Sequence, residues 1–239
     1  MEKSRKIDDH SFLRVYELKD NPNLLHQFRK DHSLPDIRLD FGVEYLRTIH
    51  AYIFQDAPRY GTTFVPGGFR DPDDSYGKTR RIGSGEKALE YKVIYSASSE
   101  IEKDLTRILN NFGGHDSLRG LDAEQVSERL AKLYADLDHV HSFGEGNSRT
   151  LREFIRQLAL EAGFTLDWDT ASVDDEKQHA LYVARDMEVM NRRFPNRVGL
   201  PPSTNAWLYG KHAGSMSLKE IIRNSLQPLA KTVDSEQNQ

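Results

Sequence analysis

The sequence contains no cysteine, which excludes a disulfide framework, a thiolate zinc site and a cysteine nucleophile. It contains no apolar run near the roughly 18–20 residues that cross a bilayer. Its first ten residues, MEKSRKIDDH, lack the apolar stretch of a secretory signal. Neither sign of charge dominates, because 33 basic residues stand against 37 acidic ones. We therefore expect a cytoplasmic globular protein that binds neither a membrane nor nucleic acid.

Helical periodicity is the main pattern that is present. Apolar residues at spacings of three and four predict a helix that follows Asp40, one that Gly113-Gly114 ends and one that starts after Asp122. The same pattern predicts helices over about 149–162, 174–193 and 217–226, with a shorter one around 12–18. Asp40 is the expected N-cap of the first of these. Capping boxes are expected at Ser99–Glu102, Asp122–Gln125 and Ser217–Glu220.

One region departs from this helical pattern. Glycine and proline concentrate between residues 58 and 85, which predicts loops. Within and after them, Thr79–Ile82 and Ala88–Tyr95 flank Gly83-Ser84-Gly85-Glu86, and this arrangement predicts a β-hairpin. The expected fold is therefore all-α with one small β-hairpin.

The turn between the helices at 123–140 and 149–162 carries the densest group of chemically useful residues. Gly144 and Gly146 let the backbone approach a ligand closely. Asn147 or Ser148 is the expected N-cap of the next helix, whose free amides form an anion site.

Two arginines follow in the first turn of that helix. Arg149 and Arg152 oppose the helix dipole there, which makes sense if an anion such as a phosphate chain lies between them and the amides. Glu145 would be repelled by that anion unless it holds Mg²⁺, which phosphates recruit together with one or two carboxylates. His141 is the expected general base.

These residues also resemble a known signature. The segment matches H-x-F-x-[DE]-G-N-G-R-x-x-R of the Fic (filamentation induced by cAMP) family, as His141-Ser142-Phe143-Gly144-Glu145-Gly146-Asn147-Ser148-Arg149-Thr150-Leu151-Arg152. The single departure is Ser148, where the family has glycine. Ile49-His50 also looks like the family's early core helix, and the hairpin lies where its flap would be. The resemblance covers residues 40–165.

The resemblance implies a protein adenylyltransferase that moves AMP, or another nucleoside monophosphate, from ATP to a protein hydroxyl with release of pyrophosphate. It implies that His141 deprotonates a Ser, Thr or Tyr side chain of the target and that Phe143 anchors the loop. Glu145 would hold Mg²⁺. The phosphates would be bound by Gly146, Asn147, Ser148, Arg149 and Arg152.

The resemblance also implies how the rest of the chain is organised. The flap would align the target by strand addition, through Tyr91, Lys92, Val93, Ile94 and Tyr95. Around the core at 40–165, with its flap at 79–95, we expect an N-terminal extension over 1–39, a C-terminal helical extension over 166–230 and a polar tail over 231–239.

Several alternatives stay open at this point. The chain could be a Fic-fold binding or regulatory module, a phosphotransferase, or a metal-dependent hydrolase using His139 and His141, although residues two apart on a helix diverge. Lys78-Thr79-Arg80-Arg81 is interpreted as a solvated loop rather than a contact for nucleotide or target. Relatives can carry, or receive from a small antitoxin, an inhibitory glutamate; here Thr232–Gln237 has the spacing, with Glu236. We favour a separate inhibitor, or none.

Overall fold

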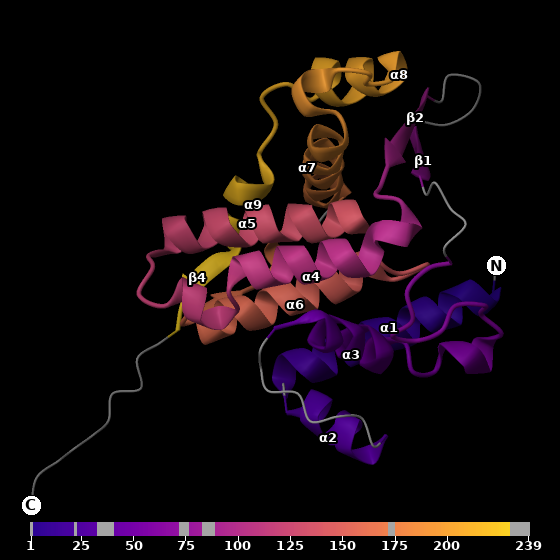
Figure 1. Cartoon of the computed structure of the whole chain (residues 1–239), viewed down its shortest axis with the longest axis vertical. Helices are drawn as coiled ribbons and strands as arrows, with labels where there is room; N and C mark the ends of the chain where they lie inside the picture. The colour runs from indigo at the N-terminus through magenta and orange to yellow at the C-terminus, as the bar shows by residue number, and fades with distance from the viewer. Residues whose placement is uncertain are drawn as a thin grey trace, which may run out of the picture.

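The computed structural model describes residues 2–21, 23–32, 41–71, 77–82, 89–171 and 175–229. These residues form a mainly helical fold with two small antiparallel sheets, which confirms the fold class expected from the sequence (Figure 1). The helices are α1 (Glu2–Asp20), α2 (Leu24–Asp31), α3 (Val43–Ile53), α4 (Ile101–Phe112), α5 (Ala123–Val140), α6 (Asn147–Glu161), α7 (Asp175–Arg193), α8 (Pro202–Thr204) and α9 (Leu218–Ser225). The strands are β1 (Gly77–Ile82), β2 (Leu89–Ile94), β3 (Phe164–Leu166) and β4 (Leu226–Pro228).

Helix α5 is the centre of the fold, and it packs against α4, α6, α7 and α9. It begins at the predicted capping box, in which the Asp122 carboxylate accepts the Gln125 backbone N–H while the Gln125 side chain accepts the Asp122 N–H. Its apolar stripe is buried, as the periodicity predicted: Val126, Leu130, Leu133, Leu137 and Val140. The rigid helix therefore delivers the segment that follows Val140 to a defined position.

Helices α1, α2 and α3 form the lower part of the molecule in Figure 1. Helices α1 and α3 pack against α6, and α2 packs against α1 and α3. Tyr45 on α3 lies at this contact, and its buried hydroxyl donates a hydrogen bond to the Gln157 side chain. Helix α1 is held to the loop after α3, because Arg14 and His10 both bind the carboxylate of Asp56. The N-terminal helix thus lies against the start of α6.

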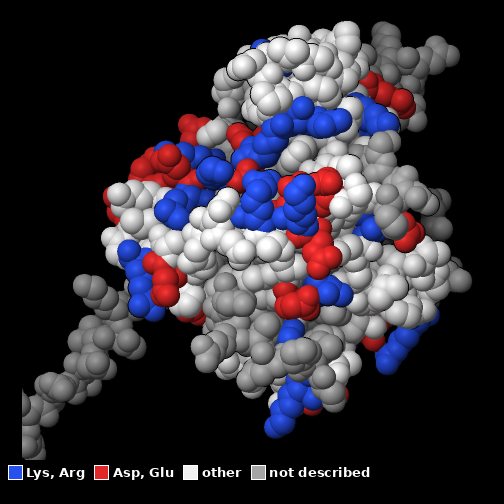
Figure 2. Space-filling view, viewed as in Figure 1, with Lys and Arg blue, Asp and Glu red and all other residues white. Residues whose placement is uncertain are grey.

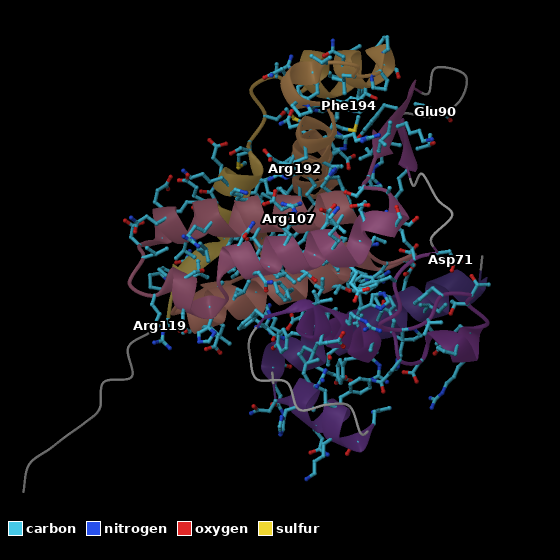
Figure 3. The ribbon with its side chains drawn as sticks, viewed as in Figure 1. Asp71, Glu90, Arg107, Arg119, Arg192 and Phe194 are labelled. Carbon is cyan, nitrogen blue, oxygen red and sulfur yellow. The ribbon has the colours of Figure 1, made fainter. Side chains whose placement is uncertain are left out.

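The hairpin of β1 and β2 packs on the opposite side, against α7 and the helical turns over 202–211. Its register pairs Gly77 with Ile94 and Ile82 with Leu89. A second apolar cluster joins these elements, formed by Tyr91, Val93, Tyr95, Val183, Val189, Met190, Trp207 and Leu208. In Figure 3, Glu90 marks the hairpin and Phe194 the residue that follows α7; α7 and β2 are in contact.

Two local expectations are wrong, and one small sheet was not expected. Helix α3 has Gly42 as its N-cap, whereas Asp40 lies outside the described residues. The capping box at Ser99 does not form, because Ser98–Glu100 make a separate 3₁₀ turn and no side chain caps α4. The small sheet of β3 and β4 was not predicted; these strands have three residues each, too few for a pattern. The box at Ser217 and Glu220 does form.

The surface mixes charges of both signs. Figure 2 shows Lys and Arg side chains interspersed with Asp and Glu over one face of the molecule. On this face Arg192 of α7, labelled in Figure 3, binds Asp136 of α5. Within the part of the chain that the structure describes, no helix is long and apolar enough to span a membrane.

Candidate active site

The segment between α5 and α6 is a tight loop held from both of its ends. His141 closes α5 in the left-handed conformation, with φ 50°. The buried guanidinium of Arg70 donates to the carbonyls of His141 and Val140, at 2.8 and 3.4 Å. A cation at these last carbonyls of α5 is favoured by the helix dipole. No local pattern predicts this role of Arg70, because it lies 71 residues from His141 in the sequence.

The middle of the loop is buried against α3. Phe143 stacks on the ring of His50, with the centroids 3.9 Å apart and the planes at 12°. His50 Nδ1 accepts the Gly67 N–H at 2.8 Å, and its Nε2 donates to the Glu145 carbonyl at 3.0 Å. Burial lowers the pKa of His50 to about 3, so that this bridge is neutral.

Asn147 has a different place from the one expected. Its side chain accepts the Phe143 N–H at 3.0 Å and donates to the Phe143 carbonyl at 2.6 Å, which closes the loop. Asn147 and Ser148 are therefore not N-caps; Gly146 occupies that position without a side-chain cap, and α6 begins at Asn147. What remains available to a ligand at Asn147 is its backbone amide.

Position 146 requires glycine, both for its backbone conformation and for the space beside it. Its φ is 79°, and a Cβ built there would come within 2.2 Å of the Phe54 ring. Any other side chain would displace Phe54 or the loop. Ser148, by contrast, lies in the first turn of α6 without a positive φ, so serine is accommodated there without strain.

One cleft of about 650 Å³ gathers the predicted residues of the motif. They line it together, as His141, Glu145, Gly146, Asn147, Ser148, Arg149 and Arg152. Helix α1 contributes Asp8 and Phe12 to the cleft, and the hairpin contributes Lys78, Arg80 and Tyr91. Glu145 and Asp8 also line a second cleft of about 730 Å³ beside the loop at 60–71.

The imidazole of His141 is buried in the wall of this cleft. It stacks on Tyr95, with the ring centroids 3.8 Å apart, and its Nδ1 lies 3.6 Å from Asp138 Oδ1. Burial lowers the pKa of His141 to about 4, although the Asp138 carboxylate acts in the opposite direction. The ring is therefore neutral near pH 7 and able to accept a proton.

The cations in the cleft differ in their partners. Arg149 binds Asp8 and Ser11 of α1, at 2.9 and 2.5 Å, and lies over the Phe54 ring. Arg152 forms no ion pair with any described residue, and burial and the neighbouring arginines lower its pKa. Lys78 also lacks an ion pair within the described ranges, and burial lowers its pKa. Such desolvated cations favour an anionic ligand.

Lys78 corrects an interpretation made from the sequence. The basic run at 78–81 was interpreted as solvated, yet Lys78 and Arg80 both line the cleft. In the hairpin register they lie opposite Val93 and Tyr91, on the face that packs against α7. Arg80 and the Tyr91 hydroxyl both bind Asp186 of α7. Successive side chains of a strand point to opposite faces, and this alternation, rather than the basic composition of the run, places Lys78 and Arg80 at the cleft.

The flap residues are only partly available. Tyr91, Val93 and Tyr95 are buried, and Tyr91 is the only member of 91–95 that lines the cleft. The outer edge of β2 is covered, because the Lys92 carbonyl accepts the Thr204 hydroxyl and the Ile94 N–H donates to Met190 Sδ. Addition of a target strand would therefore have to use β1.

The other candidates fall outside the cleft. His139 does not line it, and burial and two nearby arginines lower the pKa of His139 to about 4. No group of three or more His, Asp or Glu side chains among the described residues could hold a metal ion by itself. Thr232–Gln237, including Glu236, lies outside the described residues.

Sequence comparison agrees with this geometry. The model of the Fic/DOC family matches residues 39–159, about half of the chain. The chain belongs to the Fic/DOC family. Protein adenylyltransferase VbhT of Bartonella schoenbuchensis is 35% identical over 132 residues, which are 54% of this chain and 23% of that protein. A protein adenylyltransferase of Bartonella henselae is 27% identical over 169 residues, 69% of this chain and 29% of that protein. The chain thus spans less than a third of the length of these two relatives.

Solved structures show the Fic fold as well. The N-terminal Fic domain of a VirB-translocated Bep effector from Bartonella quintana, with bound ADP, aligns with a TM-score of 0.59 and 18% identity, over 95% of this chain and 86% of that one. BepC of Bartonella tribocorum, with bound AMPPNP, aligns at 0.57 and 18%, over 95% and 89%. At this identity the likeness concerns the fold of this Fic/DOC chain alone.

Proposed function

We propose that this Fic/DOC chain transfers AMP, or another nucleoside monophosphate, from a nucleoside triphosphate to a hydroxyl side chain of a target protein. The observation that carries the proposal is the cleft, which combines a neutral buried histidine, the open start of a helix, a carboxylate and two cations without ion pairs among the described residues. The names of the two Bartonella adenylyltransferases and the nucleotides bound by two structural neighbours support it.

The phosphate chain would bind at the start of α6. The backbone amides of Asn147 and Ser148 would face an anion there, because the first amides of a helix have no partner within it. The Gly146 N–H would join them once it leaves the Glu145 carboxylate, which accepts it at 3.0 Å. Arg152 would bind the phosphates from α6, and Lys78 would bind them from the hairpin. Arg149 would contribute its charge while it remains bound to Asp8.

The transfer step uses His141. Its imidazole would take the proton of the target hydroxyl as that oxygen attacks the α-phosphorus. The new P–O bond forms on the target while the bond between the α-phosphorus and the bridging oxygen breaks, and pyrophosphate leaves with that electron pair. The product is a phosphodiester between a Ser, Thr or Tyr side chain and the nucleoside.

Glu145 is the residue that would hold Mg²⁺. Its side chain is exposed in the cleft, and one of its oxygens accepts the Gly146 N–H at 3.0 Å, which leaves the other oxygen for a cation. One carboxylate fits Mg²⁺ when phosphate oxygens and water complete the coordination. Bound there, the ion would neutralise charge on the phosphates.

The target would lie along the hairpin and reach His141 from there. Because the outer edge of β2 is covered by Thr204 and Met190, we assign the docking edge to β1. A separate antitoxin-like inhibitor, or no inhibitor at all, remains the prediction for this chain.

Transfer of label tests the proposal. The full chain is incubated with Mg²⁺ and a lysate, once with ATP labelled at the α-phosphate and once with ATP labelled at the γ-phosphate. Relative to the same lysate without the chain, we expect additional protein label from the α-position alone, and none with the His141→Ala variant. Additional label from the γ-position would indicate a phosphotransferase instead, and no additional label from either position would indicate a binding module.

A further inference from the structure

Arg185 of α7 joins the start of α6 to the end of α5. It binds the Asp138 carboxylate with two parallel hydrogen bonds, from Nε at 3.0 Å and from Nη2 at 2.9 Å. Its third nitrogen, Nη1, donates to the Ser148 hydroxyl at 2.9 Å. The side chains of Arg185 and Asp138 are 4% and 3% exposed, so this is a buried, fixed ion pair.

Asp138 in turn faces the histidine of the motif. It lies one helical turn before His141, and its Oδ1 is 3.6 Å from His141 Nδ1. This exceeds a normal hydrogen bond, but such bonds in catalytic sites are often long before substrate binds. A carboxylate beside Nδ1 favours the tautomer protonated at that nitrogen, which leaves Nε2 to accept a proton.

Ser148 is the position at which this chain departs from the family signature. Its hydroxyl accepts a hydrogen bond from the Arg185 guanidinium, a contact that glycine could not make. The departure therefore coincides with a connection that runs from Ser148 through Arg185 and Asp138 to His141. Lys78 of the hairpin and the ring of Tyr95 also lie near the imidazole.

We propose that Asp138 and Arg185 are positioning residues that fix the tautomer and orientation of His141, and that Ser148 locks Arg185 in place. The catalytic part of this proposal rests on the proposed transfer function. Asp138 supplies the charge, Arg185 holds its carboxylate in one orientation, and Ser148 ties both to the helix that binds phosphate.

The test is Asp138→Asn, which keeps the shape of the side chain and removes its charge. We expect kcat for label transfer to fall by about 10²-fold or more, because the imidazole loses its tautomer. The affinity for a non-hydrolysable ATP analogue should change less than about two-fold. The acidic limb of the kcat–pH profile should move to lower pH, since the Asp138 carboxylate raises the pKa of His141. Ser148→Ala should lower kcat less than Asp138→Asn.

A second variant covers the case in which Asp138→Asn does not fold, because it leaves Arg185 buried without its carboxylate. The double variant Asp138→Asn/Arg185→Gln removes both charges, and we expect the same low kcat. The matched control is Asp136→Asn/Arg192→Gln, which removes an ion pair between the same two helices outside the cleft. Its kcat and pH profile should be those of the wild type.

The NMR chemical shifts of the two ring nitrogens of His141 report its tautomer and do not depend on activity. We expect the Nδ1-protonated tautomer in the wild type and a shift toward the other tautomer in Asp138→Asn. Unchanged tautomer, kcat and pH profile in a folded variant would overturn the positioning role. A wild type without transfer would overturn the proposed function alone, because the tautomer would still report on Asp138.

Discussion

The bridge made by His50 should dominate the stability of the motif loop. His50→Ala leaves the Gly67 N–H and the Glu145 carbonyl without their buried partner. Each unsatisfied group costs about 1–3 kcal/mol. Loss of the stack on Phe143 adds about 0.5–1.5 kcal/mol. We therefore expect the free energy of unfolding at pH 7 to fall by about 4 kcal/mol.

The same bridge makes this loss depend on pH. The pKa of His50 is about 3 in the folded protein, mainly because of burial, and about 6.5 in an unfolded chain. Below pH 6.5 the unfolded state therefore binds a proton that the folded state does not, and the stability contributed by neutral His50 decreases as pH falls. At about 1.4 kcal/mol per pH unit, the difference between wild type and His50→Ala should be about 2 kcal/mol smaller at pH 5 than at pH 7.

Urea denaturation followed by circular dichroism at pH 7 and pH 5 measures both quantities. The exposed His26 of α2 offers a control, and His26→Ala should change stability by less than about 0.5 kcal/mol. If His50→Ala loses less than about 1 kcal/mol, or loses the same amount at both pH values, the neutral bridge does not stabilise the loop as described.

Three further variants test the cleft. Arg152→Ala should weaken ATP binding by about ten-fold or more, because it removes charge-assisted contacts to phosphate. Arg156→Ala should instead lower the melting temperature, since Arg156 is bound inside the fold. Equal ATP affinities of the two variants in calorimetry would contradict the phosphate-binding role of Arg152. Glu145→Gln should fold normally but need more Mg²⁺ for activity, or be inactive; wild-type behaviour in a Mg²⁺ titration would remove the metal role. His141→Ala should lose about 10²–10⁴-fold in label transfer while still binding ATP, and His139→Ala far less. Comparable losses for the two histidines, with release of a bound metal, would favour the hydrolase alternative.

Local spacing along the chain was enough to predict most of the helices and the motif. The capping box at Asp122 and the apolar stripe of α5 depend on residues within a few positions of one another, so their pattern is readable along the chain. The motif residues that line the cleft span only twelve positions, from His141 to Arg152. Arg149 and Arg152 oppose the dipole at the start of one helix, so the prediction of an anion there depends on local sequence alone.

The contacts that support the motif became visible only in the folded chain. Arg185 and Asp138 are 47 residues apart, and His50 and Glu145 are 95 apart, so no local spacing relates them. The cap expected of Asn147 was wrong because Phe143 offers its side chain both a donor and an acceptor once the loop has closed. Lys78 faces the cleft because the hairpin presents one of its faces to α7. Such contacts depend on how helices and strands pack, and packing is set by the whole core rather than by neighbouring residues.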